Sequence, residues 1–340
     1  MQTKRIFIVA VFVFLILEIF AQQDKVYTAS GDILIGELKS FQRGVLVFDT
    51  DYADSEFQID WDEINGVAIG RSHLIYTADG GKYKGGLVPL GRGRLTRLVT
   101  ADGEITMSLD EIVEIASLDK RFWDRMIVSI DAGLSITKAN NVKQSSAQAN
   151  ISYRGDKWLL SGNFSNVGTT QDDVDPTVRT EGGLFFTRDL FGNAIIMGGA
   201  DFLSNSEQLL DLRSTGKAGF GYYFFRSNQL YLLAGAGFAL SNERYGGDNA
   251  TSGNSFEGLG AVEFNAYNLG DLSFLARLMT YPSLTDPGRW RINADFSLKY
   301  DLPLDFYVKL TYTHNFDSDP LIDVPRNDYV FKTSLGWEWD

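Results

Sequence analysis

Cysteine is absent from this chain of 340 residues, and histidine occurs only as His73 and His314. Without cysteine the chain has no disulfide framework, no lipid-modified N-terminal cysteine and no thiolate for zinc binding or nucleophilic catalysis. Two histidines are too few for an imidazole-rich metal site. We therefore expect neither a bound metal nor a cofactor.

A surplus of positive charge is also missing, because the formal net charge is −13. Binding to nucleic acid needs a concentrated basic surface that faces the phosphates. The composition therefore excludes nucleic acid as a partner, whereas an acidic charge is ordinary for an exported protein.

Long apolar runs are lacking except at the N-terminus. There, Ile6–Leu17 follows Lys4 and Arg5, and Ile19-Phe20-Ala21 precedes two glutamines. This order of a basic, an apolar and a small-residue region predicts a secretory signal peptide over residues 1–21. No later stretch approaches the roughly 18 to 20 apolar residues of a transmembrane helix, so we expect no spanning helix in the mature chain.

Residues 24–70 and 71–118 form a tandem repeat. The matching segments are Tyr27-Thr28-Ala29-Ser30-Gly31 with Tyr76-Thr77-Ala78-Asp79-Gly80, Gly36-Glu37-Leu38 with Gly85-Gly86-Leu87, Gly44-Val45-Leu46 with Gly93-Arg94-Leu95, and Asp62-Glu63-Ile64 with Asp110-Glu111-Ile112. Short alternating runs in each copy are separated by glycine-containing turns. This pattern predicts two small, strongly bent β-modules.

The order of turns, strands and glycines in each copy resembles the Sm-like or SH3-like small barrel. Sm-like domains often bind RNA, but an exported and acidic pair of copies has neither the compartment nor the charge for that role. We expect structural or partner-docking modules in the periplasm. The one local basic cluster, Arg92, Arg94 and Arg97, is interpreted as a solvated face.

Polar and apolar residues alternate from Met126 to Trp339, most clearly over residues 291–302. Such alternation is typical of strands that are wet on one face and in contact with lipid on the other. We therefore predict an all-β fold in which residues 119–340 form an antiparallel transmembrane β-barrel of about twelve strands. The expected strands are 126–137, 146–154, 158–166, 178–188, 193–203, 213–225, 229–240, 255–267, 271–280, 289–300, 305–316 and 328–339.

The predicted connections alternate between short turns, such as 154–157, and longer loops, such as 167–177 and 241–254. Outer-membrane barrels have short periplasmic turns and longer external loops. An even strand number then places both barrel ends and the repeated modules in the periplasm. A soluble β-sandwich also alternates, but it gives no reason for alternating loop lengths or for aromatic residues at strand ends.

The last predicted strand is rich in aromatic residues, including Tyr329, Phe331, Trp337 and Trp339. It resembles the C-terminal insertion signal of bacterial outer-membrane proteins, with the departure that Asp340 follows the final aromatic. We expect the barrel-insertion machinery as a partner, and outer-membrane lipid and lipopolysaccharide around the wall.

His314 is the one candidate for catalysis, because some outer-membrane barrels are lipid-acting enzymes with a serine–histidine pair on the wall. Alternation places His314 on the outward face with Tyr312 and Phe316, and no serine faces it on the neighbouring strands. A general base needs a hydroxyl within hydrogen-bond reach. We interpret His314 as an interfacial residue and predict no catalytic site.

Alternation assigns charges of both signs to the lumen. The inward-facing charged residues are predicted to be Asp131, Arg154, Lys217, Glu257, Glu263, Arg277, Arg291, Asp295, Lys299, Lys309, Lys332 and Glu338. Mixed charges favour a salt-bridged, largely closed lumen over a selective pore. The predicted external loops contain Asp172-Asp173-Val174-Asp175 and Asp317-Ser318-Asp319 with Asp323, whose spacing matches no EF-hand, and we interpret them as solvated.

The small-barrel region, the alternating strands and glycine-rich segments such as Gly216–Tyr222 together resemble the salt-induced outer-membrane protein family of bacteria. The resemblance implies an outer-membrane barrel of unestablished activity and transfers no functional residue. We predict a non-enzymatic barrel that serves envelope integrity or limited small-solute passage, with periplasmic modules that dock a protein or the cell wall. The alternatives are a lipid-acting enzyme and a surface protein that binds through its acidic loops.

Overall fold

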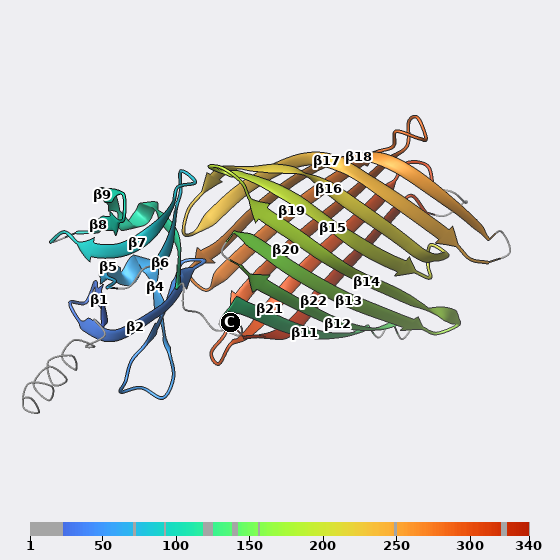
Figure 1. The fold of residues 1–340 in the computed structure, drawn as a ribbon. Coiled ribbons are helices and arrows are strands. Elements are labelled where there is room, and N and C mark those ends of the chain that lie inside the picture. The colour runs from blue at the N-terminus through green and yellow to red at the C-terminus, as the bar shows by residue number, and fades with distance from the viewer. Residues whose placement is uncertain are drawn as a thin grey trace, which may run out of the picture.

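The computed structural model shows a small N-terminal β-domain and a long β-barrel that lie end to end (Figure 1). It describes residues 23–70, 73–91, 93–117, 125–137, 142–155, 157–247, 250–320 and 325–339. The expected signal peptide and the joining segment 118–124 lie outside these residues. Among the described residues, no helix is long and apolar enough to cross a membrane.

The N-terminal domain consists of ten strands and two short 3-10 helices. The strands are β1 (Asp24–Thr28), β2 (Ile33–Gln42), β3 (Val45–Asp49), β4 (Phe57–Asp60), β5 (Ile64–Ala68), β6 (His73–Thr77), β7 (Lys82–Pro89), β8 (Leu95–Thr100), β9 (Gly103–Ser108) and β10 (Ile112–Ser117). The 3-10 helices, η1 (Trp61–Glu63) and η2 (Leu109–Glu111), each precede the last strand of one copy.

The two copies have the same topology. In each copy the first strand pairs with the second and the fifth, and the second, third and fourth strands form a meander. The match of Asp62-Glu63-Ile64 with Asp110-Glu111-Ile112 is confirmed, because each segment runs from a 3-10 helix into a fifth strand. The match of Leu46 with Leu95 is wrong by one residue, since Leu46 is fully buried and Leu95 is half exposed. The strand registers instead equate Val45 with Leu95.

The two copies share one hydrophobic core. Each copy bonds to the second strand of the other at its fifth strand: Ile115 on β10 pairs with Phe41 on β2, and the N–H of Ile69, the residue after β5, donates to the Leu87 carbonyl on β7 at 2.9 Å. Trp61 stacks on Phe41 with ring centroids 3.7 Å apart. A module of fewer than 50 residues buries too little apolar surface to be stable alone, so the exchange of strands supplies the rest of the core.

Glycine is required at the equivalent positions Gly36 and Gly85. A Cβ atom on Gly36 would lie 1.9 Å from the carbonyl oxygen of Asp49, and one on Gly85 would lie 2.1 Å from that of Val99. Both contacts occur where the second strand crosses closely over the third. The two copies therefore carry glycine at the same position because the sheet bends in the same way in both.

The barrel consists of twelve antiparallel strands and is closed by pairing of the first with the last, as in Val128 with Trp339. Its strands are β11 (Met126–Thr137), β12 (Val142–Arg154), β13 (Trp158–Gln171), β14 (Val174–Asp189), β15 (Ala194–Asn205), β16 (Leu210–Arg226), β17 (Leu230–Tyr245), β18 (Thr251–Leu269), β19 (Leu272–Pro282), β20 (Trp290–Asp301), β21 (Phe306–Asp317) and β22 (Asn327–Trp339). The predicted all-β class and the twelve-stranded antiparallel barrel are confirmed.

The barrel is apolar outside and polar inside. On β17, Phe238 and Leu240 are 59% and 64% exposed, whereas Ser241 and Glu243 are buried. Other large apolar side chains exposed on the barrel are Ile130, Leu134, Ile151, Phe164, Leu184, Phe202, Phe220, Phe224, Leu278, Phe296, Phe331 and Leu335. A closed sheet with this exterior satisfies its backbone internally and presents an apolar surface to its surroundings, as a membrane requires.

Most connections at the far end of the barrel are shorter than predicted. The expected loop 167–177 is a hairpin in which Asp172 and Asp173 alone lie outside β13 and β14. The expected loop 241–254 shrinks to residues 246–250. The strands extend beyond the band of exposed apolar side chains on the outside of the barrel. Each strand there pairs with a neighbour on both sides, so polar residues do not end the sheet.

The N-terminal domain lies at the barrel end that carries the short turns (Figure 1). The Gln229 side chain, in the turn after β16, donates to Asp62 at 2.9 Å. Gly80 of the domain packs closely on Gly192, which lies in the turn after β14. A Cβ atom on Gly80 would be only 2.4 Å from the backbone of Gly192. This juxtaposition positions the domain over one mouth of the lumen.

Candidate functional site in the barrel lumen

A cavity of about 500 Å³ occupies the middle of the lumen. Eight of the residues predicted to face the lumen line it: Lys217, Arg277, Arg291, Asp295, Lys299, Lys309, Lys332 and Glu338. Asp131 and Glu263 lie behind these side chains and accept from Lys309 and Arg277. Arg154 lies apart from this group, because it lines a second cavity at the mouth beside the N-terminal domain.

Ion pairs between strands one or two positions apart in the barrel neutralise much of the lumen wall. The Lys309 ammonium lies 2.7 Å from the Asp131 carboxylate, and Arg277 Nε lies 2.6 Å from the Glu263 carboxylate. Glu263 also accepts from the Tyr231 hydroxyl. Such charge-assisted hydrogen bonds fix long side chains against the wall and leave the middle of the lumen open as a cavity.

Two other members of the predicted set have hydroxyl partners. The Thr313 hydroxyl donates to Asp295 at 3.1 Å, and the Lys332 ammonium donates to the Ser165 hydroxyl at 3.2 Å. Among the described residues, no carboxylate forms an ion pair with the Lys332 ammonium, which faces the cavity.

Buried arginines cross the lumen at the end far from the N-terminal domain. Arg289, immediately before β20, lies 3.0 Å from Glu243 on β17 and 2.6 Å from Asp317 on β21. Arg213 on β16 lies 2.7 Å from Glu243 and 3.5 Å from Asp317. β17 and β21 are four strands apart, and β16 and β21 are five apart, so these ion pairs span part of the lumen and do not only follow its wall.

This far-end network continues toward the cavity. Arg291 pairs with the fully buried Glu257 and donates to the Ser241 hydroxyl at 2.7 Å. The guanidinium groups of Arg213, Arg289 and Arg291 balance the carboxylates of Glu243, Glu257 and Asp317. A network with every charge matched tolerates burial that a lone charge would not.

A second bridge crosses the lumen at the same end. Arg179 on β14 pairs with Asp328 on β22, four strands away around the closed barrel, and Asn205 donates to the same carboxylate at 2.9 Å. Arg179 also pairs with Glu181 on its own strand. Together the two sets of bridges narrow the far mouth.

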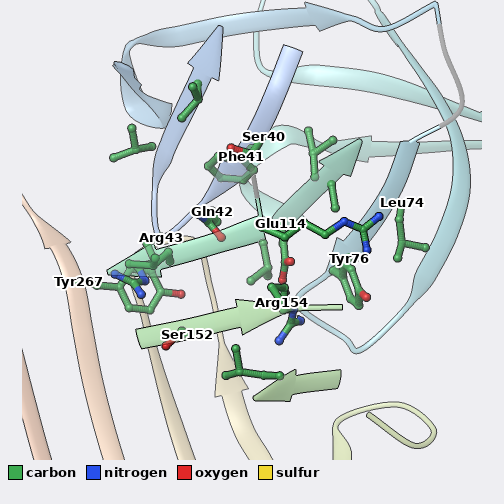
Figure 2. Close-up of a pocket in the computed structure, with 18 of the residues that line it drawn as sticks. Ser40, Phe41, Gln42, Arg43, Leu74, Tyr76, Glu114, Ser152, Arg154 and Tyr267 are labelled. Carbon is green, nitrogen blue, oxygen red and sulfur yellow. Dashed lines mark hydrogen bonds and ion pairs between the residues drawn. The ribbon is translucent and has the colours of Figure 1, made fainter. Parts of the chain in front are cut away.

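The other mouth is covered by the N-terminal domain (Figure 2). Glu114 on β10 points at the barrel, where its carboxylate lies 3.1 Å from Arg154 on β12 and 3.3 Å from Arg226 on β16. The Lys82 ammonium of the domain lies 3.4 Å from Asp189 at the end of β14. The contact is therefore electrostatic and joins the domain to three barrel strands.

The Tyr76 ring packs among the cations at this junction. The centroid of the ring lies 5.6 Å from the Arg154 guanidinium, 5.7 Å from the Lys82 ammonium and 5.9 Å from the Arg226 guanidinium, which is a cation–π arrangement. Burial raises the pKa of the Tyr76 hydroxyl, and burial lowers the pKa of Lys82 even though Asp189 opposes that shift.

Arg43 reaches from the domain into the lumen. It occupies the two-residue turn between β2 and β3 with Gly44, and both residues have positive φ angles, 50° and 79°. Turns of this kind match the twist of a hairpin, and Arg43 is an unusual residue to adopt this conformation. Its guanidinium lies 3.9 Å from Glu338 and lines both cavities. The hairpin tip is thus part of the lumen wall.

Several residues of these networks escaped the sequence prediction. Asp317 and Arg289 were expected in or beside solvated loops, but both are buried in the far-end network. The interpretation of Asp317 as a solvated loop residue is therefore wrong, because β21 extends to it. Glu243 also lay in a predicted loop, and continuing the alternation from Ser241 would have placed it inward. Asp323 and Arg92 lie outside the described residues.

The residues considered for other chemistry are placed as follows. The His314 Nε2 atom lies 3.2 Å from the Asn327 side-chain oxygen, on the outer wall beside Tyr312. Arg94 bonds to Asp110 and to the Trp61 carbonyl, so it links the two copies of the repeat. Among the described residues, no group of three or more histidine, aspartate and glutamate side chains is arranged to hold a metal ion.

The chain belongs to the family described as a protein of unknown function, DUF481, whose model matches residues 130–339. This match supports the barrel part of the family resemblance seen in the sequence, and the family description names neither a salt response nor an activity. A search of curated proteins found none that is significantly similar.

Solved structures of barrel proteins match part of the chain. The KdgM porin in complex with disordered oligogalacturonate is 13% identical, with 62% of this chain and 99% of that chain covered and a TM-score of 0.33. The NanC porin is 11% identical, with 62% and 97% covered and a TM-score of 0.37. The translocator domain of the autotransporter NalP from Neisseria meningitidis is 10% identical, with 63% and 87% covered and a TM-score of 0.34.

Proposed function

We propose that this protein is a non-enzymatic outer-membrane barrel that provides a narrow passage for small solutes and whose N-terminal domain covers the periplasmic mouth. The proposal rests on the placement of side chains in the barrel, which is the reverse of that in a water-soluble protein. Phe238 and Leu240 are exposed on the outside, while Glu257 and Arg291 are buried inside. A closed barrel of this kind is stable in a bilayer and would expose a large apolar surface in water.

The lumen supports passage of small solutes and argues against a wide pore. Its cavity of about 500 Å³ has the size of a small-molecule site. The bridges formed by Arg289 and Arg179 narrow the far mouth, and the domain covers the near one. Passage therefore requires local movement of ion pairs, as expected for a gated rather than a permanently open path.

The position of the N-terminal domain supports a periplasmic location. The domain contacts the barrel end with the short turns, which is the periplasmic end in outer-membrane barrels of known topology. Docking to the barrel uses the face of Glu114 and Tyr76, so any periplasmic protein or cell-wall partner would meet the opposite face. The closing strand β22 would be the segment recognised by the barrel-insertion machinery, and lipid and lipopolysaccharide would surround the wall.

Absence of an enzymatic role fits the surroundings of His314. Its side-chain partner is the amide of Asn327, which is neither a nucleophile nor an acid that orients a catalytic base. The residues around it on the outer wall are aromatic, such as Tyr312 at 6.3 Å between ring centroids. These surroundings suit a histidine at the membrane surface.

The natural lack of cysteine makes the location directly testable. We would introduce one cysteine in the far loop, Pro287→Cys, and one in the domain, Asp54→Cys, both at exposed positions. A membrane-impermeant maleimide should label Pro287→Cys in intact cells, and Asp54→Cys only after the outer membrane is permeabilised. Labelling of Asp54→Cys in intact cells would refute the orientation, and equal protection of both would place the protein elsewhere.

Solute passage is tested by swelling of liposomes that contain the full chain. Small sugars should enter slowly, and the larger raffinose should be excluded because of the narrow far mouth. Swelling no faster than in empty liposomes, with a correctly folded barrel, would contradict the proposal.

A further inference from the structure

A second cavity, of about 540 Å³, lies between the N-terminal domain and the barrel mouth (Figure 2). Small-molecule sites occur preferentially at such domain junctions and have volumes in this range. The cavity shares Arg43, Asn265 and Tyr267 with the cavity of the lumen, so the two adjoin. Of the residues predicted to face the lumen, Arg154 lines this junction cavity, and the chemistry of the rest of its lining differs from that of the lumen.

One wall of this junction cavity is apolar. Val45 and Val47 come from β3, Leu74 from β6, and Ile127 and Leu159 from the inward faces of β11 and β13. All five side chains are partly exposed, whereas side chains deeper in the domain core, behind them, are fully buried. Apolar surface facing a cavity gains free energy when an apolar body covers it.

The part of the cavity next to Leu159 is cationic, since Leu159 on β13 lies directly opposite Arg154 on β12. Arg154 and Arg226 line it beside Tyr76, and Glu114 pairs with both; Lys82 and Asp189, which form an ion pair next to them, do not line the cavity. Three positive charges against two negative charges leave a surplus of one positive charge. In addition, the buried Nε atom of Arg154 donates no hydrogen bond within the described part of the chain.

Unused buried donors and a charge surplus favour an anionic guest. Glu114 already serves two guanidinium groups through one oxygen atom, so a second carboxylate would complete the pairing rather than compete for it. Tyr223, Tyr231 and Tyr267 also line the cavity, and the Tyr223 ring lies 5.2 Å from the Arg226 guanidinium. These rings suit the amphipathic boundary of a molecule with one charged and one apolar end.

We propose that the junction cavity binds a small amphipathic monoanion, a carboxylate carried on an aromatic or short aliphatic body. The carboxylate lies against Arg154 and Arg226, and the apolar body covers Leu74, Ile127 and Leu159. The site goes beyond solute passage, since binding there does not require the barrel to conduct.

Calorimetric titration of the full chain in lipid nanodiscs tests the site with benzoate as the probe. Benzyl alcohol has the ring without the charge, and acetate has the charge without the ring. We expect benzoate to bind at least about tenfold more tightly than either compound, because each lacks one of the two complementary ends. Benzoate that binds no more tightly than acetate would overturn the proposal, because the apolar wall would then contribute nothing.

Variants in the cationic and the apolar part of the cavity separate the site from nonspecific uptake by lipid. Arg226→Gln should weaken benzoate binding about tenfold, the effect of one charge-assisted hydrogen bond, whereas Arg226→Lys should stay within about threefold of the natural chain. Leu159→Gln should weaken benzoate binding and leave acetate unchanged. Lys157→Gln, at an exposed position in the neighbouring turn, is the matched control and should bind as the natural chain does.

Folding of each variant is checked by the heat-dependent electrophoretic mobility of the barrel. If Arg226→Gln fails this check, Leu159→Gln decides the question. Natural affinity for benzoate in a folded Arg226→Gln or Leu159→Gln variant would refute the site.

Discussion

The N-terminal domain and the barrel use the same alternation of polar and apolar residues in opposite ways. In the domain, Leu38, Phe48 and Trp61 are fully buried against one another. In the barrel, Phe238 and Leu240 point outward, and the buried residues include charged ones, such as Glu257. The comparison teaches that alternation with a period of two residues predicts a strand with one polar and one apolar face. Which face lies inside and which lies outside depends on how the sheet closes.

The two regions are therefore held together by different forces. The domain depends on burial of apolar surface in a core shared by both copies of the repeat. The barrel depends on the closed ladder of backbone hydrogen bonds, on lipid contact and on ion pairs across the lumen. Substitutions that exchange these roles should affect one region and spare the other.

The largest expected effect is that of Trp61→Ala in the domain. Loss of this buried indole should destabilise the domain by about 3–5 kcal/mol, because it removes the stacking on Phe41 and the hydrogen bond to the Leu109 carbonyl in the other copy. Hydrogen exchange measured by mass spectrometry should show β2 and β10 losing protection together. Loss of protection confined to residues 24–68 would contradict the shared core, and the barrel strands should be unchanged.

Next in size is the effect of a charge on the outer wall. Leu184→Arg, at a position that is 59% exposed on β14, should destabilise the inserted barrel by about 2–4 kcal/mol if it lies near the middle of the bilayer. Trp158→Arg should cost about 0–1 kcal/mol, because Trp158 lies at the rim where it stacks with Tyr153 and Phe186. Urea unfolding in liposomes measures both.

Equal effects of Leu184→Arg and Trp158→Arg would contradict the positions assigned to them, with Leu184 near the middle of the bilayer and Trp158 at its edge. Arg substitutions on the core face of the domain provide the matched contrast, since they should unfold the domain in lipid and in water alike.

Removal of a lumen charge should have an intermediate effect. Arg289→Ala leaves the carboxylates of Glu243 and Asp317 without their best partner, and we expect a loss of about 1–3 kcal/mol because water in the lumen solvates them in part. Arg244→Ala, on the adjacent outward-facing position of β17, is the control and should be neutral. A neutral Arg289→Ala in stability and in permeability would show that the far-end network has no closing role.

The smallest effect should be that of Glu114→Gln at the junction. It weakens the pairing with Arg154 and Arg226 while keeping the shape of the side chain, so docking of the domain should weaken by about 1 kcal/mol. Proteolysis at the joining segment measures docking, and the Glu111→Gln variant on the exposed 3-10 helix is the control. Equally faster cleavage of both variants would mean that the net charge of the domain, and not the ion pairs of Glu114 with Arg154 and Arg226, holds the domain on the barrel.

The strands and the inward charges follow from the sequence because alternation is a local property. Asp131, Lys309 and Arg277 were predicted to face inward from their own strands, and the structure places them along or behind the cavity wall. The partners of Arg289 and Arg179 could not be predicted, since each bridge joins strands four apart in the barrel and depends on the stagger of the closed sheet.

The contacts between the N-terminal domain and the barrel could not be predicted from the sequence either. Glu114 reads as one member of an alternating strand, and nothing local indicates that two barrel arginines face it. The repeat predicted two modules, but the exchange of strands through Ile115 and Ile69 joins them into one core. Contacts between distant segments are set by packing that a single sequence does not display.

Single-channel conductance of the full chain in planar bilayers, compared with Arg289→Ala, tests the central claim most directly. A charged lumen narrowed by ion pairs predicts small, infrequent steps for the natural chain and larger or longer openings for Arg289→Ala, with Arg244→Ala unchanged. A folded barrel that stays silent in both forms would contradict a passage through the lumen.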